Sequence, residues 1–298
     1  MLILLLACFP KPEVTLGAME PLPLVRTSND RRWFVPLEVH GEQWVWFLDT
    51  GYAASTCDDG LVETLGLSTR GKAVVRGENG SLTASRAELP DFALGGHTVG
   101  GLSCVVRDLD RTSSIRDPDE VRVAGVLGMD VLRFFQVQLD PERAELRLHP
   151  PDTFTIEGAP LRRTFWDPRV KVAVDIGGQR VWPFLDTGTS SVYLDGERLA
   201  LEPIAVRENV VMRGTGHKEQ VRDIHQYRED VHFAGVPIPD VVVNGRPKGR
   251  GAEGLVGLAV VKRFVSTWDF PNGRVQLVPA TANEVHTWSE WRAAARPP

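Results

Sequence analysis

The sequence predicts an all-β protein made of two similar halves related by pseudo-twofold symmetry, with only short helices. The pentapeptide Phe-Leu-Asp-Thr-Gly occurs at positions 47–51 and again at 184–188. Each copy ends an apolar run with period-two alternation, which is typical of β-strands. Elsewhere, many short apolar runs are separated by Gly, Pro, Asn and Asp, and this pattern favours strands and turns over long helices.

Each repeated aspartate is expected to end a β-hairpin. When Asp49 is aligned with Asp186, the glycine-containing segment 41–45 falls over segment 178–182. A turn between two alternating runs predicts an antiparallel hairpin, and its second strand then carries the aspartate. The alternating residues before the two turns are Val35, Leu37 and Val39 in the first half, and Val172, Val174 and Ile176 in the second.

A second repeated element is an apolar-apolar-glycine sequence downstream of each aspartate. Val126-Leu127-Gly128 corresponds to Leu255-Val256-Gly257, and the interval from aspartate to glycine differs between the halves by about one loop. The chain is therefore interpreted as a tandem duplication. Residues that continue the correspondence are Arg133 with Lys262, Phe135 with Phe264, and Asp140 with Asp269.

The chain of 298 residues is long enough for two lobes that each bury a core. Prolines and polar residues after position 150 predict a linker. Trp288 and Trp291, three positions apart, predict a short amphipathic helix packed on a lobe. The expected segments are a signal and tether at 1–30, lobes at 31–150 and 165–280, a linker at 151–164 and a tail at 281–298. Other short helices are expected at 59–65, 130–135 and 260–264.

Two aspartates in matching positions suggest a single shared site at Asp49 and Asp186. Two carboxyl groups a few ångströms apart cannot both ionise cheaply, so the pair holds one proton over a broad pH range. The ionised member can take a proton from a water molecule, while the protonated member donates a hydrogen bond to a substrate carbonyl. The pair thus supplies a base and an acid together.

The residues beside the aspartates fit the same chemistry. Gly51 and Gly188 allow a tight backbone turn, where a Cβ would obstruct the approach of the opposite half. Thr50 and Thr187 offer hydroxyl groups that can hydrogen-bond across the interface and hold the two loops together.

On these residues the chain resembles the aspartic proteases of the pepsin and retropepsin superfamily. The resemblance rests on the two Asp-Thr-Gly sequences and the two later glycine elements, and it covers roughly positions 32–279. It implies two β-barrel-like lobes of the acid protease fold, a catalytic pair at Asp49 and Asp186, an extended polypeptide substrate between the lobes, and no cofactor. Since both aspartates lie in one chain, it also implies a monomer.

The resemblance further implies hairpin flaps over the substrate, and here the sequence departs from the pepsin pattern. The first flap is expected near position 79, with Asn79-Gly80 as its turn, and it lacks the tyrosine that is usual in pepsins. Tyr52 occupies a position that usually holds a small residue; it either fills a pocket beside the pair or packs outward. The candidate flap residues are Gly77, Glu78, Asn79 and Gly80 in the first half, and Gly214, Thr215 and Gly216 in the second.

The amino terminus predicts an address in the bacterial cell envelope. The apolar run that ends in Leu5-Leu6-Ala7-Cys8 resembles a lipoprotein cleavage box, with Cys8 as the lipidated residue, and it is too short to span a bilayer. No basic residue precedes the run, and a buried N-terminal strand is the alternative interpretation. Export would allow Cys57 and Cys104 to form a disulfide, although two free buried thiols remain equally compatible with the sequence.

Several other functions find little support in the sequence. The net charge of −5, with basic and acidic residues interspersed, gives no electrostatic case for nucleic-acid binding. The histidine spacing matches no metal-ligand motif, and a Gly-x-Ser-x-Gly element is absent. The rival to a protease is a catalytically silent peptide- or protein-binding module on the same fold. Core packing rather than ligand stacking is expected for five tryptophans: Trp33, Trp44, Trp46, Trp166 and Trp182.

Overall fold

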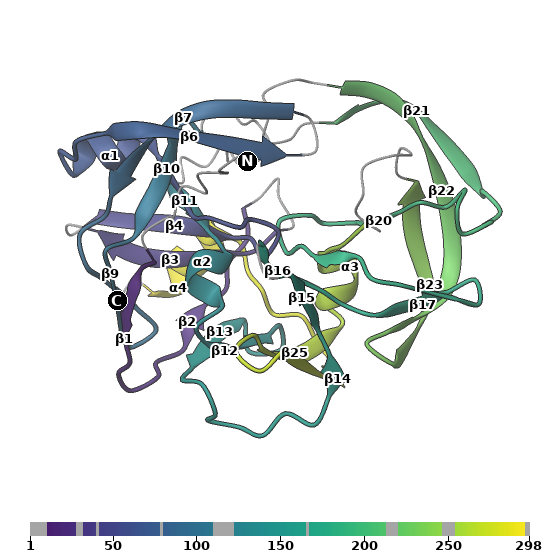
Figure 1. Ribbon diagram of the computed structural model, residues 1–298. Coiled ribbons are helices and arrows are strands. Elements are labelled where there is room, and N and C mark those ends of the chain that lie inside the picture. Colours follow the sequence, from purple (N-terminus) through teal and green to yellow (C-terminus); the bar gives the residue numbers. More distant parts are fainter. Residues whose placement is uncertain are drawn as a thin grey trace, which may run out of the picture.

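The computed structural model describes residues 11–27, 32–39, 42–77, 80–109, 122–164, 167–212, 220–245 and 254–295. Within these ranges strands dominate and the four helices are short (Figure 1). The prediction of an all-β protein with short helices is confirmed.

A seven-stranded sheet leads to the first aspartate. The first part of the chain also forms a separate three-stranded sheet. In sheet order the seven strands are β3 (Phe34–Val39), β4 (Glu42–Leu48), β11 (Val123–Leu127), β5 (Thr56–Asp58), β10 (Ser103–Arg107), β7 (Gly80–Glu88) and β6 (Arg70–Gly77). The smaller sheet contains β1 (Glu13–Thr15), β9 (His97–Gly100) and β8 (Phe92–Leu94).

A ten-stranded sheet carries the second aspartate. Its strands, in order, are β15 (Arg162–Thr164), β16 (Asp167–Lys171), β19 (Phe184–Leu185), β24 (Gly254–Val256), β20 (Val192–Leu194), β23 (Val236–Gly245), β22 (Gln220–Phe233), β17 (Val174–Ile176) and β18 (Gln179–Val181), with β21 (Ala205–Met212) paired to β22. In Figure 1 the β6–β7 and β21–β22 hairpins stand at the top of the molecule, on opposite sides.

The strand that precedes each glycine element lies between the two strands that flank an aspartate. In the first half, β11 pairs in parallel with β4 and antiparallel with β5. In the second half, β24 pairs in parallel with β19 and antiparallel with β20. The repeated sequence therefore produces a repeated strand arrangement, and in both halves the glycine element follows the central strand.

The predicted hairpin before each aspartate is continuous only in the first half. There β3 and β4 pair from Phe34 opposite Phe47 to Val39 opposite Glu42. In the second half the pairing is split into β16 with β19 and β17 with β18. Pro183 lies at the break, at the position of Trp46, and a proline has no N–H to donate to a sheet.

The two halves share a third sheet of six strands, in which β12 pairs antiparallel with β25. This pairing joins the halves through main-chain hydrogen bonds away from the aspartates. The strands are, in order, β14 (Ala159–Pro160), β26 (Arg274–Pro279), β25 (Phe264–Asp269), β12 (Gln136–Asp140), β13 (Glu145–His149) and β2 (Leu22–Pro23).

The helices lie near their predicted positions, with some shifts. α1 (Asp59–Thr64) matches the expected range, and Asp58 caps it by accepting a hydrogen bond from the Gly60 amide at 2.9 Å. α2 (Met129–Leu132) and α3 (Leu258–Val261) begin directly after the glycines and form a single turn each. They start earlier than expected, directly after the glycines. They also end earlier, because the strands β12 and β25 follow within a few residues.

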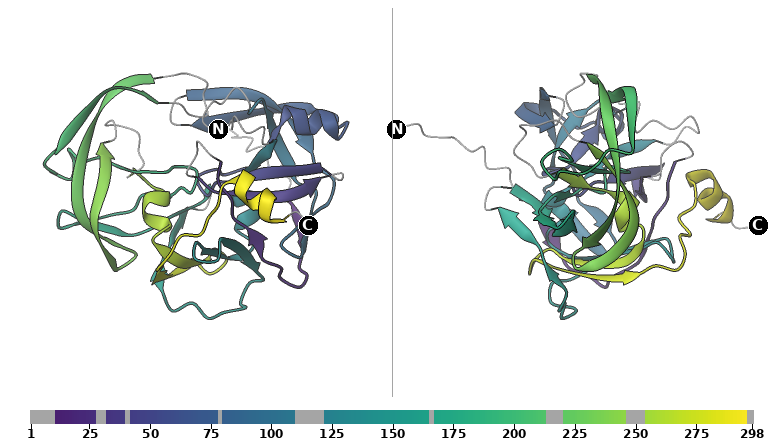
Figure 2. Two further views of the ribbon diagram at one scale, coloured as in Figure 1. Left: turned by 180° about the vertical axis from the view of Figure 1, so that it is seen from behind. Right: turned by 90° about the vertical axis from the view of Figure 1, so that its right-hand side faces the viewer.

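The tail forms α4 (Trp288–Ala295), as predicted. Trp288 is buried in a cluster with Phe34, Phe47 and Val45, and Trp291 packs against the same cluster. Although α4 follows the second half in sequence, it therefore covers strands of the first half, and the rear view in Figure 2 shows this yellow helix in front of the purple strands. No helix among the described residues is long and apolar enough to cross a membrane.

The segment expected to be a tether is partly built into the fold. Glu13–Thr15 pairs with β9, and Leu22–Pro23 pairs with β13. Leu24 is buried in the main core. The tether prediction is therefore wrong for residues 11–27, because these residues gain strand partners and core contacts. Cys8 and the rest of the expected signal lie outside the described residues. In the expected linker, residues 159–160 and 162–164 also form short strands.

Most of the predicted core tryptophans are in the core. Trp33, Trp44 and Trp46 are each less than 5% exposed. Trp182 is half-buried and has the Arg162 guanidinium 3.7 Å from its ring centroid, so packing against a cation replaces packing in the core. Trp166 lies outside the described residues.

Cys57 and Cys104 form a disulfide, with their Cα atoms 5.6 Å apart. The two residues lie on β5 and β10, which are neighbouring parallel strands, so the sheet brings them within bonding range. The sequence was compatible with either a disulfide or two free buried thiols, and the structure contains the disulfide.

Candidate active site

The two aspartates are delivered by the ends of equivalent strands. Asp49 follows β4, and its amide donates to the Leu127 carbonyl at 3.1 Å. Asp186 follows β19, and its amide donates to the Val256 carbonyl at 3.0 Å. In both halves the aspartate backbone is thus fixed by the strand that leads to the glycine element.

The carboxyl groups of Asp49 and Asp186, here called the paired aspartates, each lie against the loop of the opposite half. A Cβ on Gly188 would be 2.1 Å from Asp49 Oδ2, and a Cβ on Gly51 would be 2.5 Å from Asp186 Cγ. Real Cβ atoms do not approach other atoms so closely, so a side chain at either position would force the opposite carboxyl group to move. The structure therefore brings together the two residues that the repeat singled out, in a reciprocal arrangement.

Hydrogen bonds between the two threonines lock the loops together. The Thr50 amide donates to Thr187 Oγ1, and the Thr187 amide donates to Thr50 Oγ1, both at 3.1 Å. The Thr50 hydroxyl donates to the Leu185 carbonyl at 3.1 Å, and the Thr187 hydroxyl donates to the Leu48 carbonyl at 2.9 Å. Both threonines are buried, so these bonds have little competition from water.

Removing one of these hydroxyls is expected to destabilise the protein. Thr50→Val keeps the shape but leaves the Leu185 carbonyl and the Thr187 amide without partners, at a cost of roughly 2–4 kcal/mol in the free energy of unfolding. Chemical denaturation measures the change. Thr64→Val is the matched control, because the Thr64 hydroxyl donates to the Gly60 carbonyl at 2.8 Å but is exposed on α1. An equal loss in both variants would contradict the locking role.

The environment of Asp49 favours the protonated carboxyl. Asp49 is 5% exposed. Burial is the largest cause that raises its pKa well above the usual value, and the charge of Asp186 and a hydrogen bond with the Asp186 carboxyl add to the effect. The Gly51 amide, which donates to Asp49 Oδ1 at 2.8 Å, and the charge of Arg32 lower the pKa. The two carboxyl groups therefore titrate as a pair.

The glycine elements pack closely against the backbone of the aspartate loops. A Cβ on Gly257 would lie 2.1 Å from the Thr189 carbonyl oxygen, and one on Gly128 would lie 2.9 Å from the Tyr52 carbonyl oxygen. The residue after each glycine donates its amide to the same carbonyl: Leu258 to Thr189 at 2.9 Å, and Met129 to Tyr52 at 2.8 Å.

Asp130 adds a contact that sequence reasoning missed. Its carboxylate accepts from the Ser55 hydroxyl at 2.7 Å and from the Ser55 amide at 2.8 Å. The Ser55 oxygen in turn accepts from the Gly128 amide at 3.1 Å. The aligned residue of the second half is Ala259, so the repeat gave no signal for this link.

Tyr52 packs against the cluster of Phe34, Phe47 and Trp288. Its hydroxyl accepts a hydrogen bond from Arg107 Nη1 at 2.8 Å, and Arg107 is 5% exposed. These contacts give Tyr52 a structural role in the first half.

The flap candidates fall on two long hairpins, and the structure describes them in part. β6 and β7 pair as far as Gly77 opposite Gly80, so Gly80 is the first residue of β7. The prediction that Gly80 belongs to the turn is therefore wrong. Glu78 and Asn79 lie outside the described residues. In the second half β21 and β22 pair up to Met212 opposite Gln220. The candidates Gly214, Thr215 and Gly216 also lie outside the described residues.

Two arginines next to the aspartate loops were also missed. Arg32 Nη1 donates to the Gly188 carbonyl at 3.2 Å, and Arg169 Nη1 donates to the Gly51 carbonyl at 3.4 Å. A signal was available, because Arg32 precedes Asp49 by the same interval as Arg169 precedes Asp186.

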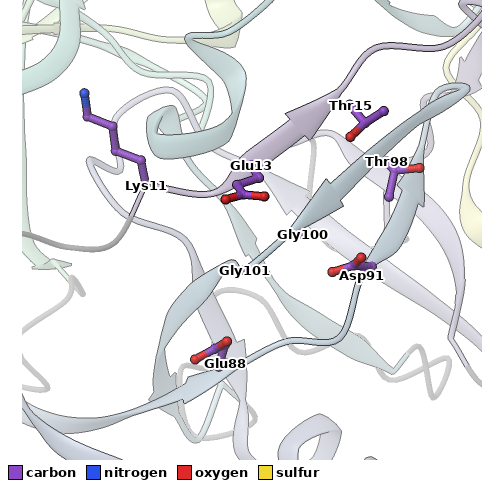
Figure 3. A pocket seen from close by; sticks show the side chains of 8 residues that line it. All are labelled: Lys11, Glu13, Thr15, Glu88, Asp91, Thr98, Gly100 and Gly101. Atoms are coloured by element: carbon purple, nitrogen blue, oxygen red, sulfur yellow. The ribbon is translucent and has the colours of Figure 1, made fainter.

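A surface hollow of about 360 Å³ lies elsewhere, beside β1 and β9 (Figure 3). It is lined by Lys11, Glu13, Thr15, Glu88, Asp91, Thr98, Gly100 and Gly101. None of these residues belongs to the aspartate loops. Among the described residues, no group of three or more His, Cys, Asp or Glu is arranged to hold a metal ion.

Comparison with known proteins agrees with the geometry of the first half. No curated protein matched the sequence. Residues 35–131 match the model of a protein family described as aspartyl protease. The matched region runs from β3 into α2 and contains Asp49, the disulfide and the first glycine element. This part of the chain is therefore similar to the aspartyl proteases, and the match supports a peptidase.

Proposed function

We propose that the protein is an aspartic endopeptidase that hydrolyses peptide bonds with a water molecule held between Asp49 and Asp186. The observation that carries the proposal is the reciprocal placement of the two carboxyl groups, each against the glycine of the other loop. The raised pKa of Asp49 beside Asp186 supports a pair that carries one proton. The family match over residues 35–131 supports the same reaction class.

The pair returns to its starting state in the proposed reaction. The ionised carboxylate removes a proton from water, and the water oxygen attacks the carbonyl carbon. The protonated carboxyl gives its proton to the carbonyl oxygen, so a neutral tetrahedral diol forms. The pair then gives a proton to the amide nitrogen as the C–N bond breaks, and it takes a proton from one diol hydroxyl. It ends with one proton, as it began.

The substrate in this proposal is an extended polypeptide bound beneath the β6–β7 and β21–β22 hairpins. Strand edges can bind a peptide through main-chain hydrogen bonds, with alternate side chains entering pockets. Val74 on β6 and Val221 on β22 are 60% and 61% exposed, which supports a role in covering an apolar ligand. Since one chain supplies both aspartates, we also propose that the protein acts as a monomer, which size-exclusion chromatography with light scattering tests.

Cleavage of a peptide library, followed by mass spectrometry from acidic to neutral pH, tests the function. We expect hydrolysis that is inhibited by a statine-type peptide, because its tetrahedral hydroxyl group mimics the diol. Tight binding of library peptides without hydrolysis would instead indicate a catalytically silent binding module and would overturn the proposal.

We further propose that the protein is exported and anchored in the bacterial envelope through lipid on Cys8. The disulfide between Cys57 and Cys104 supports this location, because such bonds persist in oxidising compartments. Wild type is expected in the membrane fraction, and Cys8→Ser in the soluble fraction of the same cells. Equal partition of the two proteins would contradict the anchor.

A further inference from the structure

Two arginines contact the loops of the paired aspartates in the same way. The Arg32 guanidinium lies 4.7 Å from the ring centroid of Phe47 and donates to the Gly188 carbonyl at 3.2 Å. The Arg169 guanidinium lies 4.4 Å from the ring centroid of Phe184 and donates to Gly51 at 3.4 Å. Each arginine therefore rests on an aromatic ring of its own half and binds the aspartate loop of the other half.

A carboxylate orients one of these arginines. Asp167 accepts from Arg169 Nη2 at 2.6 Å and from Arg169 Nε at 2.9 Å. Two parallel hydrogen bonds of this kind fix the plane of a guanidinium. In the sequence, Asp30 precedes Arg32 by the same interval as Asp167 precedes Arg169. Asp30 lies outside the described residues.

The positive charges act on the paired aspartates. The groups that shift the pKa of Asp49 are, besides its burial, Asp186, the Gly51 amide and Arg32, and the charge of Arg32 lowers it. The pKa of Arg169 is raised first by its hydrogen bonds to Asp167, and the charges of Asp186 and Asp49 contribute. One arginine from each half thus interacts electrostatically with the site that both halves form.

We propose that Arg32 and Arg169 are positioning residues, which clamp the two aspartate loops to each other and place positive charge beside the paired aspartates. The threonine hydrogen bonds lock the loops in the interior, and the arginines hold the glycine carbonyls farther along the same loops. The clamp keeps the two carboxyl groups at a separation at which they share a proton. Its kinetic consequences rest on the proposed peptidase function, but its effect on ionisation does not.

The expected kinetic result separates position from charge. Arg32→Gln removes both the hydrogen bond to the Gly188 carbonyl and the positive charge. We expect kcat to fall roughly tenfold to a hundredfold while KM changes far less. A nearby positive charge favours the ionised carboxylate, so its loss raises the pKa of the pair. The acidic limb of the kcat/KM profile should therefore move to higher pH. Arg32→Lys keeps the charge but loses the planar donor, so kcat should fall while the limb stays in place.

Arg162→Gln is the matched control, because Arg162 also stacks on an aromatic ring, that of Trp182. We expect it to retain the wild-type kcat and pH profile. If Arg32→Gln and Arg169→Gln behave like this control, the clamp is wrong. A KM increase at unchanged kcat would also overturn it, because that result indicates a substrate-binding role.

A measurement that needs no turnover closes the test. Carboxyl-carbon NMR follows the titration of the paired aspartates in wild type, Arg32→Gln and Arg162→Gln. The lower apparent pKa of the pair should rise in Arg32→Gln alone, and superimposable titrations in all three proteins would refute the proposal. If the shift is seen but wild type cleaves no peptide, the clamp stands and the peptidase function fails.

Discussion

Asp49→Asn and Asp186→Asn are each expected to abolish peptide cleavage, with a loss in kcat of roughly a thousandfold or more. An asparagine cannot accept a proton from water, nor can it carry the proton that the other carboxyl must share. Because the two groups act as one unit, the double variant should lose little more activity than either single variant. Turnover of a peptide library, measured by mass spectrometry, gives the result. Wild-type turnover by either variant would remove the catalytic claim.

The stability of Asp49→Asn provides the control for folding. The direction of the expected change in stability follows from the raised pKa of Asp49. The pKa is raised in the folded protein, so wild type loses stability as pH rises from the usual carboxyl pKa to the raised value. Asparagine has no such penalty. We therefore expect the variant to be at least as stable as wild type at neutral pH and to lose this advantage below the usual carboxyl pKa. Denaturation curves at both pH values test this.

Gly188→Ala is expected to lower both the stability of the protein and its kcat. The added Cβ would lie 2.1 Å from Asp49 Oδ2, so the carboxyl group and the loop must move apart. Overpacking of this kind costs roughly 1–3 kcal/mol in the free energy of unfolding. Displacement of the carboxyl by about 1 Å lowers kcat by about a hundredfold.

Ser190→Ala, on the same loop, is the control for Gly188→Ala, because Ser190 is exposed. Its kcat and its unfolding free energy should stay close to those of wild type. If Gly188→Ala retained wild-type kcat, the reciprocal contact between Asp49 and Gly188 would not matter for the reaction.

The repeat in the sequence predicted the centre of the fold well, because strand alternation and glycine positions are local signals. Both aspartates directly follow strands, and both apolar-apolar-glycine elements lie beside them. Thr50 and Thr187 form the cross-interface bonds that their positions suggested.

Contacts between distant parts of the chain could not be predicted from the sequence. Pairing of β12 with β25 depends on how the two halves meet, and no local pattern encodes it. The packing of Trp288 against Phe34 likewise depends on the path of the tail around the molecule. Asp130 has no counterpart in the second half, so alignment of the halves did not reveal it. By contrast, Arg32 and Arg169 are visible in the alignment, but their function depends on contacts with the opposite loop.

In the proposed reaction, Asp49 and Asp186 hold one attacking water molecule between them. A crystal structure of the protein with a statine-type peptide tests it most directly, because the hydroxyl of the mimic occupies the place of that water. We predict that this hydroxyl lies within hydrogen-bonding distance of one carboxyl oxygen of each aspartate, with the peptide backbone extended beneath the two hairpins. A peptide bound elsewhere, or a hydroxyl that reaches only one of the two aspartates, would show that the pair does not hold the attacking water.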